Sequence, residues 1–239
     1  MSNSAFHIHQ GDALTVLRTM PSESVDCCIT SPPYYGLRDY GVSGQIGLER
    51  TPEAYIARLV EVFREVRRVL RADGTLFVNV GDSYNAHPGQ RKETDKAGAK
   101  QATSVGSVGA PSRSIPGLKP KDLIGIPWLL AFALRADGWY LRQDIIWHKP
   151  NPMPESVRDR CTKAHEYLFL LSKVGRYWWD PEAVREPASD VGRVNGRDGR
   201  SEDKSARPPG SGPRTLKRLD YTKLGRNRRS VWTISTRSE

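Results

Sequence analysis

Residues 25–34 read Val-Asp-Cys-Cys-Ile-Thr-Ser-Pro-Pro-Tyr, and this run decides how the rest of the chain is interpreted. Its first half is apolar and has the length of a strand. Pro32 favours an extended conformation at Ser31, and neither proline can donate a backbone hydrogen bond to a helix or a sheet. The run therefore predicts a strand over 25–29 with a rigid exit at its carboxyl end, which is where open α/β sheets bind their ligands.

The predicted exit presents acceptor oxygens beside an aromatic ring. The prolines fix the backbone and leave its carbonyl oxygens free, Ser31 adds a hydroxyl and Tyr34 adds a flat ring. This combination suits a planar heterocycle with an amino group, because the ring can stack while the oxygens hold the amine. A Pro-Pro turn that only closes a strand is the alternative interpretation, and an isolated Ser-Pro-Pro-Tyr run would favour it.

The composition favours an acidic partner. The 239 residues carry a formal net charge of +10, which is weak support for a nucleic-acid partner when taken alone. No apolar segment approaches the ~20 residues of a membrane span. Because the N-terminus also lacks a secretion signal, we expect a cytoplasmic protein, encoded by a bacterium or a phage, with no membrane partner.

The three cysteines indicate neither a disulfide framework nor a metal site. None of them has the spacing of metal ligands, and we expect no metal. Cys27 and Cys28 lie in the apolar run, so we expect both to be buried there as small hydrophobic residues.

The alternation of strand-like and helix-like patterns predicts an α/β fold. The strand at 25–29, a helix over 51–70 and a strand over 75–80 have the lengths of a parallel crossover unit. Thr51 is placed to cap this helix, and Gly74 to end it in a left-handed conformation. Further elements are expected in the following ranges: strands at 6–9, 139–147 and 165–171, and helices at 13–20 and from about 122 or 127 to 137.

The chain is expected to contain three regions. Residues 1–184 form a catalytic core, within which 85–117 is a mobile loop almost without large apolar residues. Residues 185–230 carry most of the excess positive charge and form a basic target-recognition or linker region suited to phosphate contacts. Residues 231–239 begin a further segment. A solvated insertion is the alternative interpretation of the loop, and a basic linker is the alternative interpretation of the basic region.

Two blocks of the sequence resemble one enzyme family. Residues 31–34 are similar to the catalytic run of the amino-methylating DNA methyltransferases, which act on the exocyclic nitrogen of cytosine (N4) or adenine (N6). Residues 145–154, followed by Arg160 and by His165 and Glu166, resemble the family block that helps to form the pocket for the target base. The arrangement is similar to that of members whose catalytic motif precedes the cofactor motif.

The resemblance implies a Rossmann-like, S-adenosylmethionine-dependent methyltransferase sheet with helices on both faces. It implies double-stranded DNA as substrate, within a restriction-modification system. Ser31 favours cytosine N4, because adenine N6 enzymes more often have aspartate there; adenine N6 is the alternative. The implied roles are catalysis by Ser31, Pro32, Pro33 and Tyr34, cofactor contact by Asp12, Thr30 and Ser31, and base binding by Tyr34, Trp147, Lys149, Asn151 and Arg160.

Structural roles are the alternatives for several of these residues. Asp12 is also well placed as the N-cap of the helix at 13–20, and Trp147 could only cap the core. His165 and Glu166 could only start a strand. These alternatives stay open at the level of the sequence.

One part of the family pattern does not occur in the 239 residues. The Phe-x-Gly-x-Gly turn, which in the family receives the methionine part of S-adenosylmethionine, is not found in the sequence. We therefore expect an incomplete sheet with an exposed apolar edge, and a second chain that supplies the missing cofactor half. A truncated, inactive remnant that binds DNA without methylating it is the alternative.

Overall fold

The computed structural model describes residues 6–85, 108–109, 115–187 and 225–235. Contacts divide the chain into two units, one made of Met1–Trp178 with Ser230–Glu239, the other of Trp179–Arg229. Most of the expected loop 85–117 and of the expected basic region 185–230 lies outside the described residues. The sheet and the candidate site belong to the first unit.

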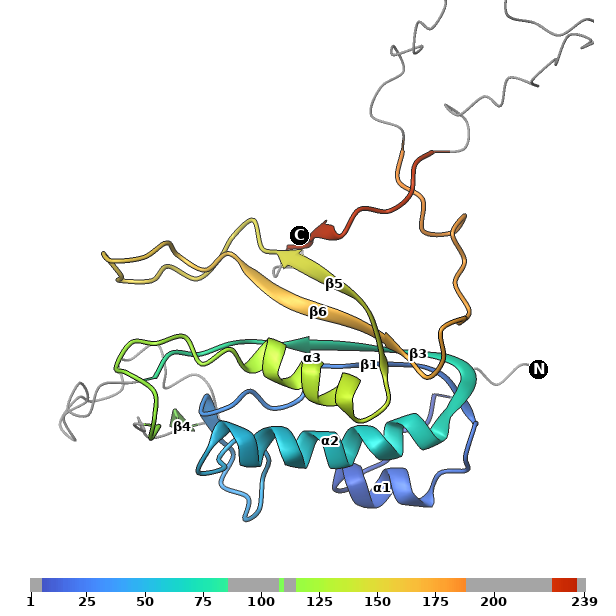
Figure 1. The fold of residues 1–239 in the computed structure, drawn as a ribbon, viewed down its shortest axis with the longest axis horizontal. Coiled ribbons are helices and arrows are strands. Elements are labelled where there is room, and N and C mark those ends of the chain that lie inside the picture. Colours follow the sequence, from blue (N-terminus) through green and yellow to red (C-terminus); the bar gives the residue numbers. More distant parts are fainter. Residues whose placement is uncertain (1–5, 86–107, 110–114, 188–224, 236–239) are drawn as a thin grey trace, which may run out of the picture. The chain divides into compact units, whose positions relative to one another are not determined.

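A five-stranded mixed sheet forms the centre of the first unit, in the order β1-β3-β6-β5-β7 (Figure 1). β1 runs parallel to β3 and β5 parallel to β7, whereas β6 is antiparallel to both of its neighbours. A second, two-stranded sheet pairs β2 with β4. The strands are β1 (Val25–Thr30), β2 (Arg38–Asp39), β3 (Leu70–Val80), β4 (Val108–Gly109), β5 (Tyr140–His148), β6 (His165–Ser172) and β7 (Val231–Thr233).

The expected crossover unit is confirmed as β1, α2 (Pro52–Val69) and β3. The Thr51 hydroxyl accepts a hydrogen bond from the Ala54 amide at 3.2 Å, and Pro52 follows it, so this helix begins as its sequence predicts. The apolar side of α2, which includes Tyr55 and Phe63, packs on the strands in one core cluster. The sheet and its crossover form the expected incomplete Rossmann-like α/β fold.

The described helices cover one face of the sheet. α1 (Ala13–Thr19), α2 and α3 (Ile126–Ala136) lie on the same side of the strands in Figure 1, and residues of all three pack in the same core cluster. The resemblance implied helices on both faces, and the part of the chain described here provides those of one face. None of the three helices is long and apolar enough to cross a bilayer.

The opposite face of the sheet is open at β1. Ile29 is 77% exposed, and no described strand pairs with the edge of β1 that faces away from β3. Cys27 points to this open face and is exposed, so the expectation that it is buried is wrong, whereas its neighbour Cys28 is partly buried. Alternation along a strand places the two thiols on opposite faces, and only one face is covered by helices.

Gly74 does not end a helix. The helix ends at Val69 and β3 begins directly at Leu70, so Gly74 lies inside the strand and its φ is not positive. A Cβ atom at this position would lie 3.0 Å from the Asp26 carbonyl oxygen of β1. Glycine is therefore required here by the close approach of two strands and not by a left-handed turn.

Two other expectations differ from the structure. Residues 6–9 are extended and exposed but belong to no described strand, because an isolated strand has no partner for its backbone groups. The helix expected up to Asp137 is α3, whose apolar sequence would favour extensive burial, yet Leu129 and Phe132 are exposed. Gly138 follows it with a φ of +99°, as its sequence predicts.

Two polar side chains tie the loops after β3 to the core. Asp82 Oδ1 accepts hydrogen bonds from the Gly125 and Ile126 amides, both at 3.0 Å, and so caps α3 in place of an N-cap side chain. Asn85 is buried; its Nδ2 donates to the Leu118 and Lys119 carbonyls, and its Oδ1 accepts from the Ile115 amide. This Asn85 clamp joins the two ends of the segment from 86 to 114.

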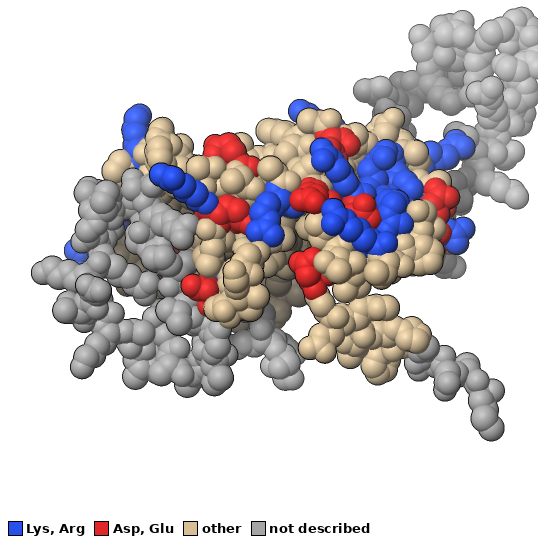
Figure 2. All heavy atoms as spheres, turned by 90° about the horizontal axis from the view of Figure 1, so that it is seen from below, with Lys and Arg blue, Asp and Glu red and all other residues tan. Residues whose placement is uncertain are grey.

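Figure 2 shows the face that carries α1 and α2, where lysine and arginine side chains alternate with acidic ones. Several of these charges are paired, for example Arg64 with Asp137 at 2.6 Å and Arg68 with Glu65 at 2.7 Å. Because acidic partners neutralise part of this surface, its positive charge alone does not mark it as the face that binds nucleic acid.

Candidate active site

The run 31–34 lies at the carboxyl end of β1, as the sequence predicts. β3 runs parallel to β1, so Gly81, which follows β3, lies at the same edge of the sheet. The antiparallel β6 starts at this edge, and its second residue is Glu166. Lys149 follows directly after β5 at this edge. Residues from four separate parts of the chain therefore meet where the rigid exit begins.

The two proline carbonyls have different environments. The Pro33 carbonyl accepts a hydrogen bond from the Tyr55 hydroxyl of α2 at 2.7 Å, which fixes the run against the helix. Pro32 is buried, and its carbonyl accepts no hydrogen bond from any residue in the described ranges. Of the two acceptors that the sequence predicts, the Pro32 carbonyl is thus the one left for a ligand.

Ser31 and Tyr34 point toward each other and share a cluster of oxygen atoms. The Tyr34 hydroxyl lies 2.8 Å from both Asn79 Oδ1 and Glu166 Oε2, and Ser31 Oγ lies 3.4 Å from that hydroxyl and 3.3 Å from Asn79 Oδ1. Asn79 is oriented by its amide nitrogen, which donates to the Tyr167 carbonyl at 3.1 Å. Ser31 and Tyr34 have one hydroxyl proton each, so this oxygen cluster has more acceptors than donors.

Gly81 makes room for the Tyr34 ring. A Cβ atom at position 81 would lie 2.5 Å from Tyr34 Cε2 and 2.7 Å from Cδ2. Because real side chains do not approach so closely, only glycine allows the ring to occupy this position. The ring is therefore held at one side by backbone and at its tip by the oxygen cluster.

The charges around the cluster keep Tyr34 protonated. Burial raises the pKa of the Tyr34 hydroxyl, and the charge of Glu166 raises it further. Burial also raises the pKa of Glu166, but the hydrogen bonds from Lys149 and Tyr34 outweigh this and leave the pKa lowered, so the carboxylate stays charged. Tyr34 is consequently a neutral donor beside a fixed anion.

Glu166 should contribute to stability only above its own pKa. Because its folded pKa is lowered, this contribution is present above the unfolded value of about 4.3 and is lost as the pH falls through the folded value. We expect the Tm of the wild type to fall more steeply below about pH 4.3 than that of Glu166→Gln. Glu53→Gln, at an exposed position in the first turn of α2, is the control, and identical slopes for wild type and Glu166→Gln would contradict this prediction.

Trp147, near the end of β5, and Lys149, just after it, lie beside the oxygen cluster. Lys149 pairs with Glu166, and its Nζ lies 4.9 Å from the centre of the Trp147 ring. Trp147 is paired in register with Glu166 and donates through its indole nitrogen to the Ile234 carbonyl at 3.1 Å. The structure thus brings four predicted residues together: Ser31, Tyr34, Trp147 and Lys149.

Arg160 and Asn151 are not linked to this cluster by any described contact. The Arg160 guanidinium pairs with Glu155 at 2.6 Å and lies 4.3 Å from the centre of the Tyr84 ring. Asn151 is exposed in the loop after β5. Their expected role in base binding therefore stays a prediction.

Asp12 has the structural role that its position predicts. Its Oδ1 accepts hydrogen bonds from both the amide and the hydroxyl of Thr15 at 2.9 Å, which caps α1. These bonds are the main reason why the pKa of Asp12 is lowered. The second oxygen, Oδ2, has no hydrogen bond within the described part of the chain, and Thr30 at the end of β1 is partly exposed.

Two residues of the site, Asn79 and Tyr55, are not predicted from the sequence, nor is the role of Gly81, whereas Glu166 belongs to the block that resembles the base pocket. Asn79 carried a signal, because it is the one polar residue in the apolar run Leu-Phe-Val-Asn-Val at 76–80.

Burial raises the pKa of the Cys28 thiol to about 11, so this cysteine is no nucleophile at neutral pH. Within the described ranges, no group of three or more His, Cys, Asp or Glu side chains could hold a metal ion.

Comparison with known proteins finds similar sequences among type II methyltransferases. The type II methyltransferase M.XycI of Xanthomonas campestris pv. cyanopsidis is 54% identical over 190 residues, which are 80% of this chain and 62% of the relative. M.SmaI of Serratia marcescens is 56% identical over 180 residues, 75% of this chain and 60% of the relative. The chain thus spans about three fifths of the length of these relatives.

A solved structure of the PvuII DNA methyltransferase (cytosine-N4-specific) aligns with a TM-score of 0.48 at 18% identity, over 72% of this chain and 50% of that one. Residues 25–239 match the family of N6/N4 methyltransferases described as DNA methylase. Since this match covers most of the chain, the chain belongs to the DNA methylase family of N6/N4 methyltransferases.

Proposed function

We propose that this chain is the larger part of a site-specific DNA methyltransferase that acts on the exocyclic amine of an extruded base. The observation that carries the proposal is the oxygen cluster of Ser31, Tyr34, Asn79 and Glu166, in which acceptor oxygens outnumber the two hydroxyl donors. An exocyclic amine brings two N–H donors, and a buried acceptor without a donor is costly. The cluster is therefore complementary to such an amine.

The residues of the run would act by positioning the base. Tyr34 stacks on it, while Ser31 Oγ and the Pro32 carbonyl accept the two amine protons. These hydrogen bonds draw the nitrogen lone pair out of conjugation with the ring and fix its direction. The amine so held would take the methyl group that bound S-adenosylmethionine supplies and would release one proton to solvent, so no covalent enzyme intermediate would be required.

The donor and acceptor groups at the edge of the sheet fit S-adenosylmethionine. Asp12 Oδ2 and the Ser31 hydroxyl are exposed acceptors, and with Thr30 they would contact the nucleoside end of the cofactor. When bound, the cofactor supplies a methyl group on a positively charged sulfur. The residues of the chain would hold the amine of the base in the orientation in which it accepts this methyl group.

We propose cytosine N4 as the methylated atom, on the strength of serine at position 31, with adenine N6 as the alternative. The test is expression in a host without N4 or N6 methylation, followed by mass spectrometry of genomic nucleosides. N4-methylcytosine is expected, and N6-methyladenine would overturn the choice of base but not the reaction. Loss of both signals in Ser31→Ala would assign the product to this site.

We propose further that a second polypeptide supplies the Phe-x-Gly-x-Gly cofactor half and packs on the open side of β1. The exposed Ile29 and the edge of β1 without a described partner support this. The nucleoside analysis is therefore repeated with a co-expressed polypeptide that carries this motif. Methylation only in its presence is expected, whereas methylation by the chain alone would contradict the need for it.

Cofactor binding gives an independent prediction. Because the 239 residues contain no Phe-x-Gly-x-Gly turn, we expect the purified chain to bind S-adenosylmethionine weakly or not at all. Isothermal calorimetry with the chain alone measures this, and the mixture with the co-expressed polypeptide is the positive control. Micromolar binding by the chain alone would be the contrary result.

The second candidate function is a DNA-binding remnant without methyltransferase activity. The net charge of +10 supports contact with DNA in either case, and the basic region 185–230 is proposed to provide it. DNA binding without any methylated nucleoside, even with the co-expressed polypeptide, would favour the remnant. Either function would operate where the DNA of the cell lies, in the cytoplasm.

A further inference from the structure

The segment 36–49, called here the 36–49 loop, directly follows the base-binding run and is closed at its base. The Gly36 amide donates to the Gly47 carbonyl at 2.8 Å, so the two ends of the loop lie side by side. Gly47 has a φ of +106°, and a Cβ atom there would lie 3.0 Å from the Tyr34 carbonyl oxygen. The base of the loop thus rests on the same residue that is proposed to stack on the target base.

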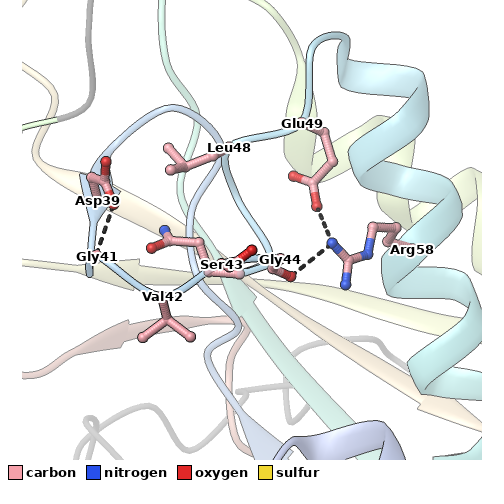
Figure 3. Close-up of a pocket in the computed structure, with 9 residues that line it drawn as sticks. Asp39, Gly41, Val42, Ser43, Gly44, Leu48, Glu49 and Arg58 are labelled. Carbon is pink, nitrogen blue, oxygen red and sulfur yellow. Dashed lines mark hydrogen bonds and ion pairs between the residues drawn. The ribbon is translucent and has the colours of Figure 1, made fainter.

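Polar side chains hold the interior of the 36–49 loop in one conformation. Gln45 Oε1 accepts from the Tyr40 amide at 2.7 Å, and its Nε2 donates to the Arg38 carbonyl at 3.0 Å. Arg58 of α2 donates to the Gly44 carbonyl at 2.9 Å and pairs with Glu49 at 3.5 Å (Figure 3). Hydrogen bonds therefore fix the loop, and Ile46 packs against the core beside them.

Two apolar side chains of the loop are exposed to solvent. Tyr40 is 47% exposed, and Val42 is 64% exposed. Figure 3 shows Val42 on the outer side of the loop, pointing away from Leu48. A hollow of about 480 Å³ lies within the loop, and Arg58 of α2 lines it together with loop residues such as Val42 and Leu48. Apolar side chains held in fixed positions in solvent are typical of a surface that contacts a partner.

We propose that Tyr40 and Val42 enter the DNA duplex at the position that the extruded base leaves. This inference rests on the proposed function and identifies the residues that stabilise the opened duplex. Extrusion costs a few kcal/mol because the neighbouring bases lose their stacking partner, and an inserted apolar or aromatic side chain restores part of that contact. The short connection between Tyr34 and Tyr40 places the two events in the same part of the duplex.

The test compares two DNA duplexes of the same mixed sequence, one intact and one with a single abasic site. The abasic duplex already contains the gap, so no recognition sequence is needed. Fluorescence anisotropy at low salt measures the affinity of the full chain for each. We expect the wild type to bind the abasic duplex about tenfold more tightly, a ratio in the range of one base–aromatic stacking contact.

The variants Tyr40→Ala and Val42→Ala are expected to reduce this preference toward equal affinity while retaining the affinity for the intact duplex. Val174→Ala is the matched control, because this valine is also exposed but follows the far end of β6. The two loop residues make no described side-chain contact that holds the loop, so the variants should fold.

Each other outcome counts against the proposal. If both loop variants keep the preference, if the wild type shows none, or if the variants lose affinity equally for both duplexes, insertion into the gap is wrong while DNA binding and the proposed function stand. If the wild type binds neither duplex at low salt, the proposed function falls together with the inference.

Discussion

Tyr34→Ala is expected to reduce methyl transfer by at least about 100-fold, since it removes both the stacking surface and the group that orients the oxygen cluster. The variant should nevertheless fold, because Tyr34 is only half-buried at the margin of the core. The stability cost is expected to be about 1–3 kcal/mol, because Asn79 and Glu166 lose the Tyr34 hydroxyl as a hydrogen-bond partner, although Ser31 and Lys149 remain as their other donors. Nucleoside mass spectrometry and thermal unfolding measure the two effects.

Two control variants separate stacking from hydrogen bonding. Tyr34→Phe keeps the ring and loses the hydroxyl, so its activity should lie between those of the wild type and Tyr34→Ala. Tyr140→Ala removes an exposed tyrosine at the opposite end of the sheet and should leave activity unchanged. Full activity in Tyr34→Ala would remove this residue from the active site.

Gly81→Ala is expected to be nearly as damaging. Its backbone conformation is open to alanine, since its φ is not positive, but the added Cβ would overlap two carbon atoms of the Tyr34 ring. The ring must then move by roughly 1 Å, and a displacement of that size in a positioning group can cost about 100-fold in rate.

Gly175→Ala is the matched control for this substitution. Its added Cβ would meet Tyr140 at 3.5 Å, an ordinary contact, so we expect no loss of activity. The double variant Tyr34→Ala with Gly81→Ala gives a sharper test. If Gly81 acts only through the ring, the double variant is no worse than Tyr34→Ala alone. Additive losses would show that Gly81 has a role of its own.

The sequence predicts the elements of this fold well where the pattern is local. The crossover helix carries its own capping residue and apolar stripe, and two prolines dictate the exit after β1. Both features depend only on neighbouring residues, so the sequence predicts their positions correctly. Gly74 shows the limit of such reasoning. Its conformation depends on how closely β1 approaches β3, and this distance cannot be read from residues 71–74.

The oxygen cluster illustrates the same limit at the site. Ser31 and Tyr34 were found from a short motif, but Asn79 lies 45 residues from Tyr34 in the chain, and Glu166 lies 132 residues away. Only the register of β3 with β6 brings these side chains to the tyrosine. Burial of Cys27 was mispredicted for a related reason, because the alternation of a strand does not tell which of its faces a helix will cover.

The Asn85 clamp has a consequence for the protein as an engineering scaffold. One amide side chain binds backbone groups at 115, 118 and 119, so these hydrogen bonds fix the separation of the two attachment points. A Gly-Ser tether in place of 86–107, which keeps the pairing of β4 with β2, is therefore expected to lower the Tm less than Asn85→Ala does, as measured by calorimetry.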